Sequence, residues 1–158
     1  AIVLTFASLA GGVVHVLLRR RELEASARAE LLLAYVLVFC VGISGVLSGL
    51  GHVFNGPEIA QKIGWTPGSP FQFEVGMHNF AWGVLGLMCL RFKGGFRVAT
   101  GLGWSIFLLG AGFGHLRDLI QKGNYAPYNF GMIAPDLLIP VLILGLMLAA
   151  RKTAGPGI

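Results

Sequence analysis

The feature that most constrains this fold is a series of five apolar stretches separated by short polar connections. They cover residues 1–18, 31–54, 74–91, 98–117 and 131–150. Each is close to the ~20 residues that an α-helix needs to cross a bilayer. Hydrophobic residues make up 55% of the chain and charged residues only 12%, with a mean hydropathy of +0.75, as is typical of membrane proteins. The sequence therefore predicts one all-α domain over residues 1–158, an integral membrane bundle of about five transmembrane helices.

The basic residues divide unequally when the connections are assigned to alternate sides of the membrane. One side holds nine of the twelve: Arg19, Arg20, Arg21, Arg28, Arg91, Lys93, Arg97, Arg151 and Lys152. The other side holds Lys62, Arg117 and Lys122. Because cytoplasmic loops are enriched in Lys and Arg, this predicts an amino terminus outside and a carboxyl terminus in the cytoplasm. The net charge of +5 then reflects orientation and contact with the lipid bilayer, and we expect no nucleic-acid partner.

Glycine is abundant, with 24 residues, and it is concentrated inside the apolar stretches. Gly45 and Gly49 in the second stretch, and Gly110 and Gly114 in the fourth, have the four-residue spacing that lets helix backbones approach closely in membranes. We therefore expect the helices over 31–54 and 98–117 to form the tightly packed centre.

Two connections have patterns of their own. Residues 19–30 favour a helix, so we expect the first helix to continue past the membrane, with Glu24 and Arg28 paired on one face. In the connection at 55–73, Pro57 suits the first turn of a short helix, and Trp65 suits the membrane interface.

Ionisable side chains inside membrane spans are costly and are therefore candidate functional residues. Six of them are predicted near the outer ends of four spans: His52, Glu74, His78, His115, Asp118 and Asp136. Imidazole and carboxylate groups are good ligands for transition metals, and helix bundles build such sites from facing helices. One hypothesis is a metal site with His52, Glu74, His78 and His115 as ligands. Asp118 or Asp136 would then orient an imidazole.

Three other interpretations of these residues remain open. His52 and His115 are the best pair for axial ligation of a haem iron. The same residues also suit a pocket for a lipid, a quinone or a proton relay. In the plainest interpretation they contact only water, headgroups and loop backbone. HExxH and CxxC patterns are absent, so the spacing of these residues does not choose between the interpretations. For Asp136 we favour an amino-terminal helix cap over a proton-carrying acid.

Several short motifs resemble a family of small bacterial multi-span membrane proteins of unknown function. They are Gly51-His52, Ile63-Gly64-Trp65, Gly68-Ser-Pro-Phe-Gln-x-Glu74-x-Gly76, Asn124-Tyr-Ala-Pro127 and Asp136-Leu-Leu-Ile-Pro140. The resemblance covers about residues 40–150 and implies an all-helical protein of the bacterial inner membrane. It also implies a small residue in place of His78 in relatives, which leaves His52, Glu74 and His115 as the core of any metal site. It implies no activity, cofactor or substrate.

The absence of any complete catalytic motif argues against an enzyme. We predict a non-catalytic accessory or scaffold subunit of a larger membrane complex, with an outward-facing polar pocket and with other membrane subunits or a second copy as partners. The alternatives are a redox protein that binds a metal or haem through the His/Glu cluster, and a proton-coupled transporter that uses Asp136.

Overall fold

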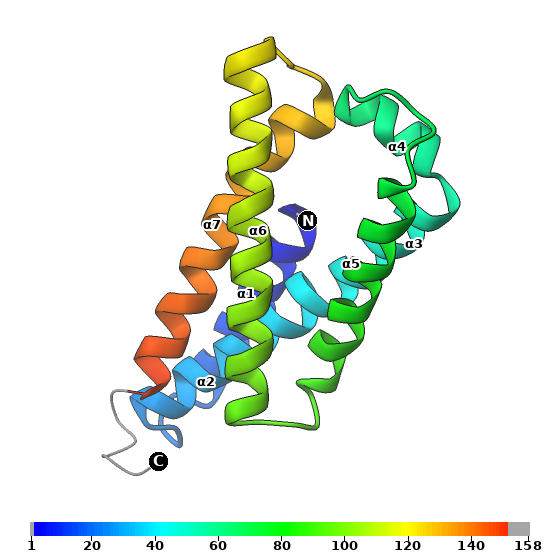
Figure 1. Cartoon of the computed structure of the whole chain (residues 1–158). Coiled ribbons are helices and arrows are strands. Elements are labelled where there is room, and N and C mark those ends of the chain that lie inside the picture. Colours follow the sequence, from blue (N-terminus) through cyan, green and yellow to red (C-terminus); the bar gives the residue numbers. More distant parts are fainter. Residues whose placement is uncertain (1, 152–158) are drawn as a thin grey trace.

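The computed structural model describes residues 2–151, and all regular secondary structure in this range is helical. The elements are α1 (Ile2–Leu18), α2 (Ala25–Val36), η1 (Leu37–Ile43), α3 (Ser44–Phe54), α4 (Gly56–Ile63), α5 (Phe71–Met88), α6 (Gly95–Lys122) and α7 (Pro127–Arg151) (Figure 1). The all-α prediction is confirmed. Lys152, one of the predicted cytoplasmic basic residues, lies outside the described range, as do the two ends of the predicted 1–158 domain.

The first connection differs from its prediction. Helix α1 ends at Leu18, and a connection over residues 19–24, which begins with a turn, precedes α2, so the rest of the charged segment lengthens the second helix and not the first. Arg28 does not pair with Glu24. Its guanidinium donates to the backbone carbonyls of Leu23, at 2.9 Å, and of Arg20. The turn leaves these carbonyls without helical partners, and an arginine side chain satisfies them.

Helices α2, η1 and α3 join end to end and form one rod over Ala25–Phe54. The middle section, η1, is a π-helix of seven residues. Such segments are rare and occur often at functional sites. The rod begins six residues before the predicted span at 31–54, because the helix-favouring residues after the turn belong to it.

Glycines allow close packing of α3 and η1 against α5. A methyl group at Gly49 would lie 2.7 Å from the backbone nitrogen of Phe80, and one at Gly45 would lie 2.9 Å from the Cα of Gly83. Gly42 faces Gly86 in the same way. The prediction that the 31–54 helix uses its glycines for close packing is therefore confirmed, but the partner is α5 and not α6.

Helices α6 and α7 form a second close pair, joined by a short connection (Figure 1). Gly101 packs against Ile143 and Met147 of α7, and Gly112 packs against Asp136. The predicted contact glycines Gly110 and Gly114 are not used, since a methyl group placed at either meets no described atom within 4 Å apart from the adjoining residues and nearby backbone of its own helix. The four-residue spacing alone does not determine which way a glycine faces.

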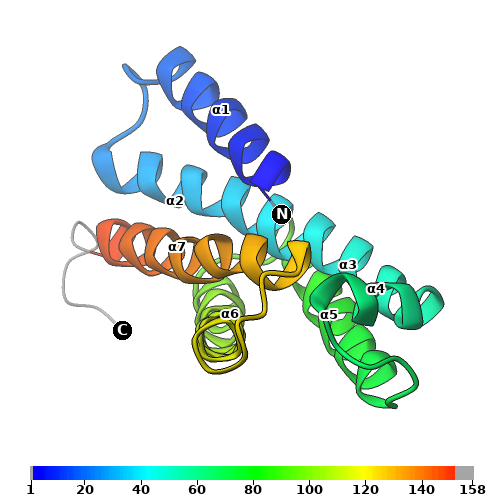
Figure 2. The ribbon, with the colours of Figure 1, turned by 90° about the horizontal axis from the view of Figure 1, so that it is seen from above.

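The hydrophobic core lies where α2 and η1 cross α7 and α6. Leu33, Leu37 and Ile143 are almost completely buried there, with Trp104 beside them. Figure 2 shows α7 running along α2, while α1 diverges from α2 on the opposite side. The core thus joins the two close pairs where α2 and η1 meet α6 and α7. From there the two pairs diverge toward α4 (Figure 1).

The two ends of the molecule are built differently. At one end, α4 and the α6–α7 connection lie together, and this is called the α4 end (Figure 1). At the opposite end, Arg97 is 5% exposed and donates to Glu30 at 2.7 Å and to the carbonyl of Cys89 at 3.0 and 2.8 Å. Arg97 therefore joins α2, α5 and α6. The sequence had placed it only among the predicted cytoplasmic basic residues, so this structural role is an additional one.

Among residues 2–151, three helices are long and apolar enough to cross a membrane: Ala25–Phe54, Gly95–Lys122 and Pro127–Arg151. Helix α1 is apolar but shorter. Helix α5 has 18 residues and carries Gln72, Glu74, His78 and Asn79, which lower its hydropathy. The prediction of a membrane protein is confirmed at this level, whereas the count of five spans stays a prediction.

Candidate functional site

A cavity of about 930 Å³ lies between the two close helix pairs. One wall comes from α3 and α5, including Ser48, His52 and Asn79, and the other from α6 and α7. Ile59 and Ile63 of α4, with Trp65, line it at the α4 end. Most of the lining is aliphatic or aromatic, with a few polar groups, which is the usual composition of small-molecule sites in proteins.

Helix α4 is placed by the residues that begin and end it. Pro57 stands in its first turn, as predicted, and Gly64 ends it in the left-handed conformation at φ 82°. A side chain is disfavoured at that φ, which explains the glycine. Glu58 and Lys62 pair at 2.6 Å on its exposed face. This pairing lowers the pKa of Glu58 and raises that of Lys62, so both remain charged at neutral pH.

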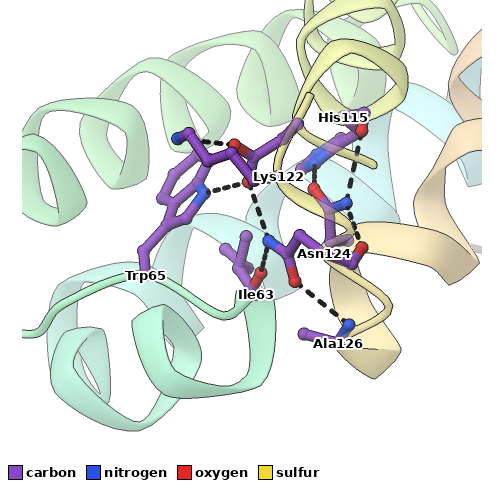
Figure 3. A network of polar contacts seen from close by, with 8 residues as sticks. Ile63, Trp65, His115, Lys122, Asn124 and Ala126 are labelled. Atoms are coloured by element: carbon purple, nitrogen blue, oxygen red, sulfur yellow. Dashed lines mark hydrogen bonds and ion pairs between the residues drawn. The ribbon is translucent and has the colours of Figure 1, made fainter. Parts of the chain in front are cut away.

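A hydrogen-bond network fastens this end of the cavity (Figure 3). We call it the Asp118 network and define it by Trp65, Asp118, Lys122 and Asn124. The carboxylate of Asp118, 8% exposed, accepts from Trp65 Nε1 at 3.2 Å, Asn124 Nδ2 at 2.7 Å and Lys122 Nζ at 2.6 Å. Asn124 Nδ2 also donates to the carbonyl of Ile63 at 2.9 Å. The network therefore ties the end of α4 to the α6–α7 connection.

His115 and Asp136 are brought together inside the cavity wall. His115 Nδ1 lies 2.8 Å from Asn129 Oδ1, and its Nε2 lies 3.9 Å from Asp136 Oδ2. Asn129 is fully buried and donates in turn to the carbonyls of His115 and Asn124. Asp136 is nine residues beyond the start of α7, with Pro135 and Pro140 inside the helix, so the predicted cap role is wrong. Helix α7 starts earlier than expected because Pro127 can occupy its first position.

The other predicted residues lie apart from this pair. His52 lines the cavity, and its Nδ1 lies 2.7 Å from Gln72 Oε1. Glu74 is exposed on α5. His78 packs against the ring of Phe107, with centroids 4.3 Å apart. Within the described range, no three His, Cys, Asp or Glu side chains are close enough to hold a metal ion. The structure therefore lends the four-ligand metal hypothesis no support, and both it and the haem hypothesis stay predictions.

Two cavity residues escaped the sequence analysis altogether. Asn79 is 5% exposed and Trp104 is 4% exposed, and both line the cavity. In the part of the chain that the structure describes, Asn79 Oδ1 and Trp104 Nε1 have no hydrogen-bond partner. The asparagine at position 79, inside an apolar stretch, was the signal available in the sequence. It was missed because only ionisable residues in the spans were selected as candidates.

These features define the class: a small helical protein with three helices long and apolar enough to cross a membrane, and with a partly polar cavity between its helix pairs. The chain belongs to the family described as "Family of unknown function (DUF6790)", which it matches over residues 1–156. No curated protein and no solved structure matches it. The match agrees with the predicted resemblance to a family of unknown function.

Proposed function

We propose that this protein is a non-catalytic membrane protein that holds a small amphipathic molecule in the cavity between its two helix pairs. The observation that carries the proposal is the cavity itself. Its volume of about 930 Å³ is near the upper end of the range usual for small-molecule sites, and its lining is mainly apolar with a few polar groups.

Binding is a better account of this site than catalysis because its polar groups largely satisfy one another. His52 is bonded to Gln72, and His115 to Asn129. Asp118 accepts from three side chains. Groups held in this way can orient a ligand or close the site. A general base or a metal ligand, by contrast, needs an atom directed at its target.

The topology is part of the proposal: five membrane-crossing helices, with the α4 end outside, in a bacterial inner membrane. Helices α1 and α5 would supply the two additional crossings, and α5 would do so with its polar residues turned partly toward the cavity. The imbalance of basic residues, nine against three, supports the orientation. The outward-facing pocket is then this cavity.

Service as an accessory subunit of a larger membrane complex is the second part of the proposal. The chain has 158 residues and little mass outside its helices, which favours a role beside larger subunits. Mild detergent extraction from native membranes, followed by size analysis, tests this part. We expect co-purification with larger subunits, whereas an isolated stable monomer would contradict it.

The binding proposal is tested by filling the cavity without disturbing the packing. Gly110 lines the cavity and has room for a side chain, because a methyl group placed there meets no described atom within 4 Å beyond the adjoining residues and nearby backbone of its own helix. Gly145 of α7 has the same room but does not line the cavity. Lipid extracts of protein purified in mild detergent, measured by mass spectrometry, should contain a bound molecule for the natural chain and Gly145→Leu but not for Gly110→Leu. Equal content in all three, or none in any, would refute ligand binding in the cavity.

A further inference from the structure

A second hollow lies between α1 and α2, at the end of the molecule opposite α4. Helix α1 moves away from α2 toward their connection (Figure 2), and a pocket of about 270 Å³ lies on that side. We call it the α1–α2 pocket. Ala27, Leu31 and Ala34, which share one face of α2, form its apolar wall. It is separate from the cavity described above, because the two have no lining residue in common.

Basic side chains from three separate segments line the α1–α2 pocket. Arg19 directly follows α1, Lys93 lies in the α5–α6 turn, and Arg97 lies in the first turn of α6. Glu30 is the only carboxylate among the described lining residues, so Lys and Arg side chains outnumber carboxylates three to one. Segments far apart in the sequence therefore create a positively charged pocket.

Two of these cations are available to a ligand. Arg97 and Glu30 pair with each other at 2.7 Å, so their charges cancel. In the part of the chain that the structure describes, the exposed Lys93 ammonium has no ion-pair partner. Arg19 pairs with Glu22 at 3.0 Å, and these side chains are 52% and 63% exposed. Such an exposed pair contributes little to stability, so Arg19 can exchange Glu22 for another anion.

The surface of α1 beside the pocket is apolar. Val14 and Leu18 are 55% and 79% exposed, and each directly precedes a lining residue, His15 or Arg19. Basic pockets at the ends of membrane helices bind anionic lipid headgroups, whose acyl chains then need an apolar surface. A soluble anion would use the cations and leave the apolar surface of α1 uncovered. The two features together favour a lipid.

We propose that the α1–α2 pocket binds the headgroup of an anionic glycerophospholipid such as phosphatidylglycerol. The phosphate accepts from Lys93 Nζ and from the Arg19 guanidinium, and the acyl chains lie along the exposed apolar side chains of α1. The pocket is smaller than the usual site for a whole small molecule, so it holds the headgroup and not the chains. This site is additional to the cavity of the proposed function and independent of what the cavity binds.

The experiment compares dioleoylphosphatidylglycerol with dioleoylphosphatidylcholine, which has the same chains and phosphate but no net charge. Native mass spectrometry of the detergent-purified, delipidated protein measures the Kd of each lipid. We expect phosphatidylglycerol to bind about twentyfold more tightly, because each basic residue near the lipid contributes about fivefold. Lys93→Gln and Arg19→Gln should each reduce this preference to about fivefold.

Matched controls remove the same charge outside the pocket. Arg91→Gln changes the same α5–α6 turn as Lys93→Gln, and Arg20→Gln changes the residue next to Arg19. Both arginines are exposed, and neither lines the pocket. Each control should keep the preference of the natural chain. Gly110→Leu, which fills the other cavity, should keep it as well, so a failure of the proposed function would leave this test intact.

Three results would overturn the proposal. The first is equal binding of the two lipids to the natural chain. The second is an equal loss of preference in Arg91→Gln and Arg20→Gln, because attraction would then come from the overall charge of this end and not from the pocket. The third is displacement of phosphatidylglycerol by millimolar inorganic phosphate, which would identify a site for a soluble anion.

Discussion

Arg97 shows how a single side chain can join three segments at the end opposite α4. It is buried, it pairs with Glu30 of α2, and its other donors reach the Cys89 carbonyl at the end of α5. That carbonyl lies where helix α5 ends and needs a partner from outside the helix. A buried charge with three bonds stabilises the fold only while all its partners are present.

We therefore expect Arg97→Gln to destabilise the protein. The substitution leaves Glu30, whose side chain is 37% exposed, without its cation and removes at least one bond to the Cys89 carbonyl, and losing such charge-assisted hydrogen bonds costs about 1.5–3 kcal/mol. Thermal unfolding in detergent should show a clear fall in Tm. Arg91→Gln, at an exposed position, is the control and should change Tm little.

The Asp118 network makes a second prediction at the residue scale. Asp118→Ala removes the acceptor shared by Trp65, Asn124 and Lys122, so the end of α4 loses its attachment to the α6–α7 connection. Hydrogen exchange of the α4 amides should accelerate about tenfold or more, the effect of losing about 1.4 kcal/mol of local stability. Exchange in α2 should not change. Glu58→Ala, which breaks only an exposed pair, should leave both unaffected.

At the scale of the elements, glycines determine which helices pair. The contact of α3 with α5 is backbone against backbone at Gly45, Gly49 and Gly83, so there is no flexible side chain to move aside. Helices α5 and α6 meet instead at larger side chains, such as His78 against Phe107. Small residues therefore let α3 approach α5 and let α6 approach α7. Where larger side chains meet instead, the helices stay farther apart, and the cavity lies between the two pairs.

We expect Gly49→Ala to loosen the α3–α5 pair. Its methyl group would lie 2.7 Å from the Phe80 nitrogen and 2.8 Å from the Gly76 oxygen, so the helices must separate, at a cost of about 1–3 kcal/mol. Thermal unfolding in detergent measures this loss. Gly145→Ala adds the same methyl group in open space and should leave Tm unchanged or raise it slightly. Equal effects of the two substitutions would contradict the packing argument.

At the scale of the whole molecule, the proposed orientation assigns nine basic residues to one side of the membrane and three to the other. Lys93 and Phe92 lie in the α5–α6 turn, and Tyr125, 73% exposed, lies in the α6–α7 connection. The proposed orientation puts these two connections on opposite sides of the membrane.

Cysteine labelling tests that orientation. In a chain with Cys40→Ala and Cys89→Ala, we expect Tyr125→Cys to react with a membrane-impermeant maleimide in cells whose outer membrane is permeabilised. Lys93→Cys should react only after the inner membrane is opened. The reverse pattern would invert the topology, and labelling of both from outside would argue against an odd number of crossings between them.

Much of the fold follows from local patterns. The apolar stretches predicted helices close to α1, α3, α5, α6 and α7, and Pro57 predicted the start of α4. Helix ends were less accurate: α5 begins at Phe71 rather than 74, and α7 at Pro127 rather than 131. These ends are amphipathic or polar, and hydropathy alone does not include such residues in a span.

The sequence by itself determined that this chain is helical and apolar enough for a membrane. Each helix makes its backbone hydrogen bonds within one contiguous segment, so the length and composition of that segment predict the helix. Only the tertiary structure decided that Gly45 meets Gly83, that His115 meets Asp136 while Glu74 remains exposed, and that Asn79 and Trp104 share a cavity. Those contacts depend on how each helix is rotated and where it crosses its neighbours. Rotation and crossing are set by many side chains acting together and are not recorded in the spacing of any one motif.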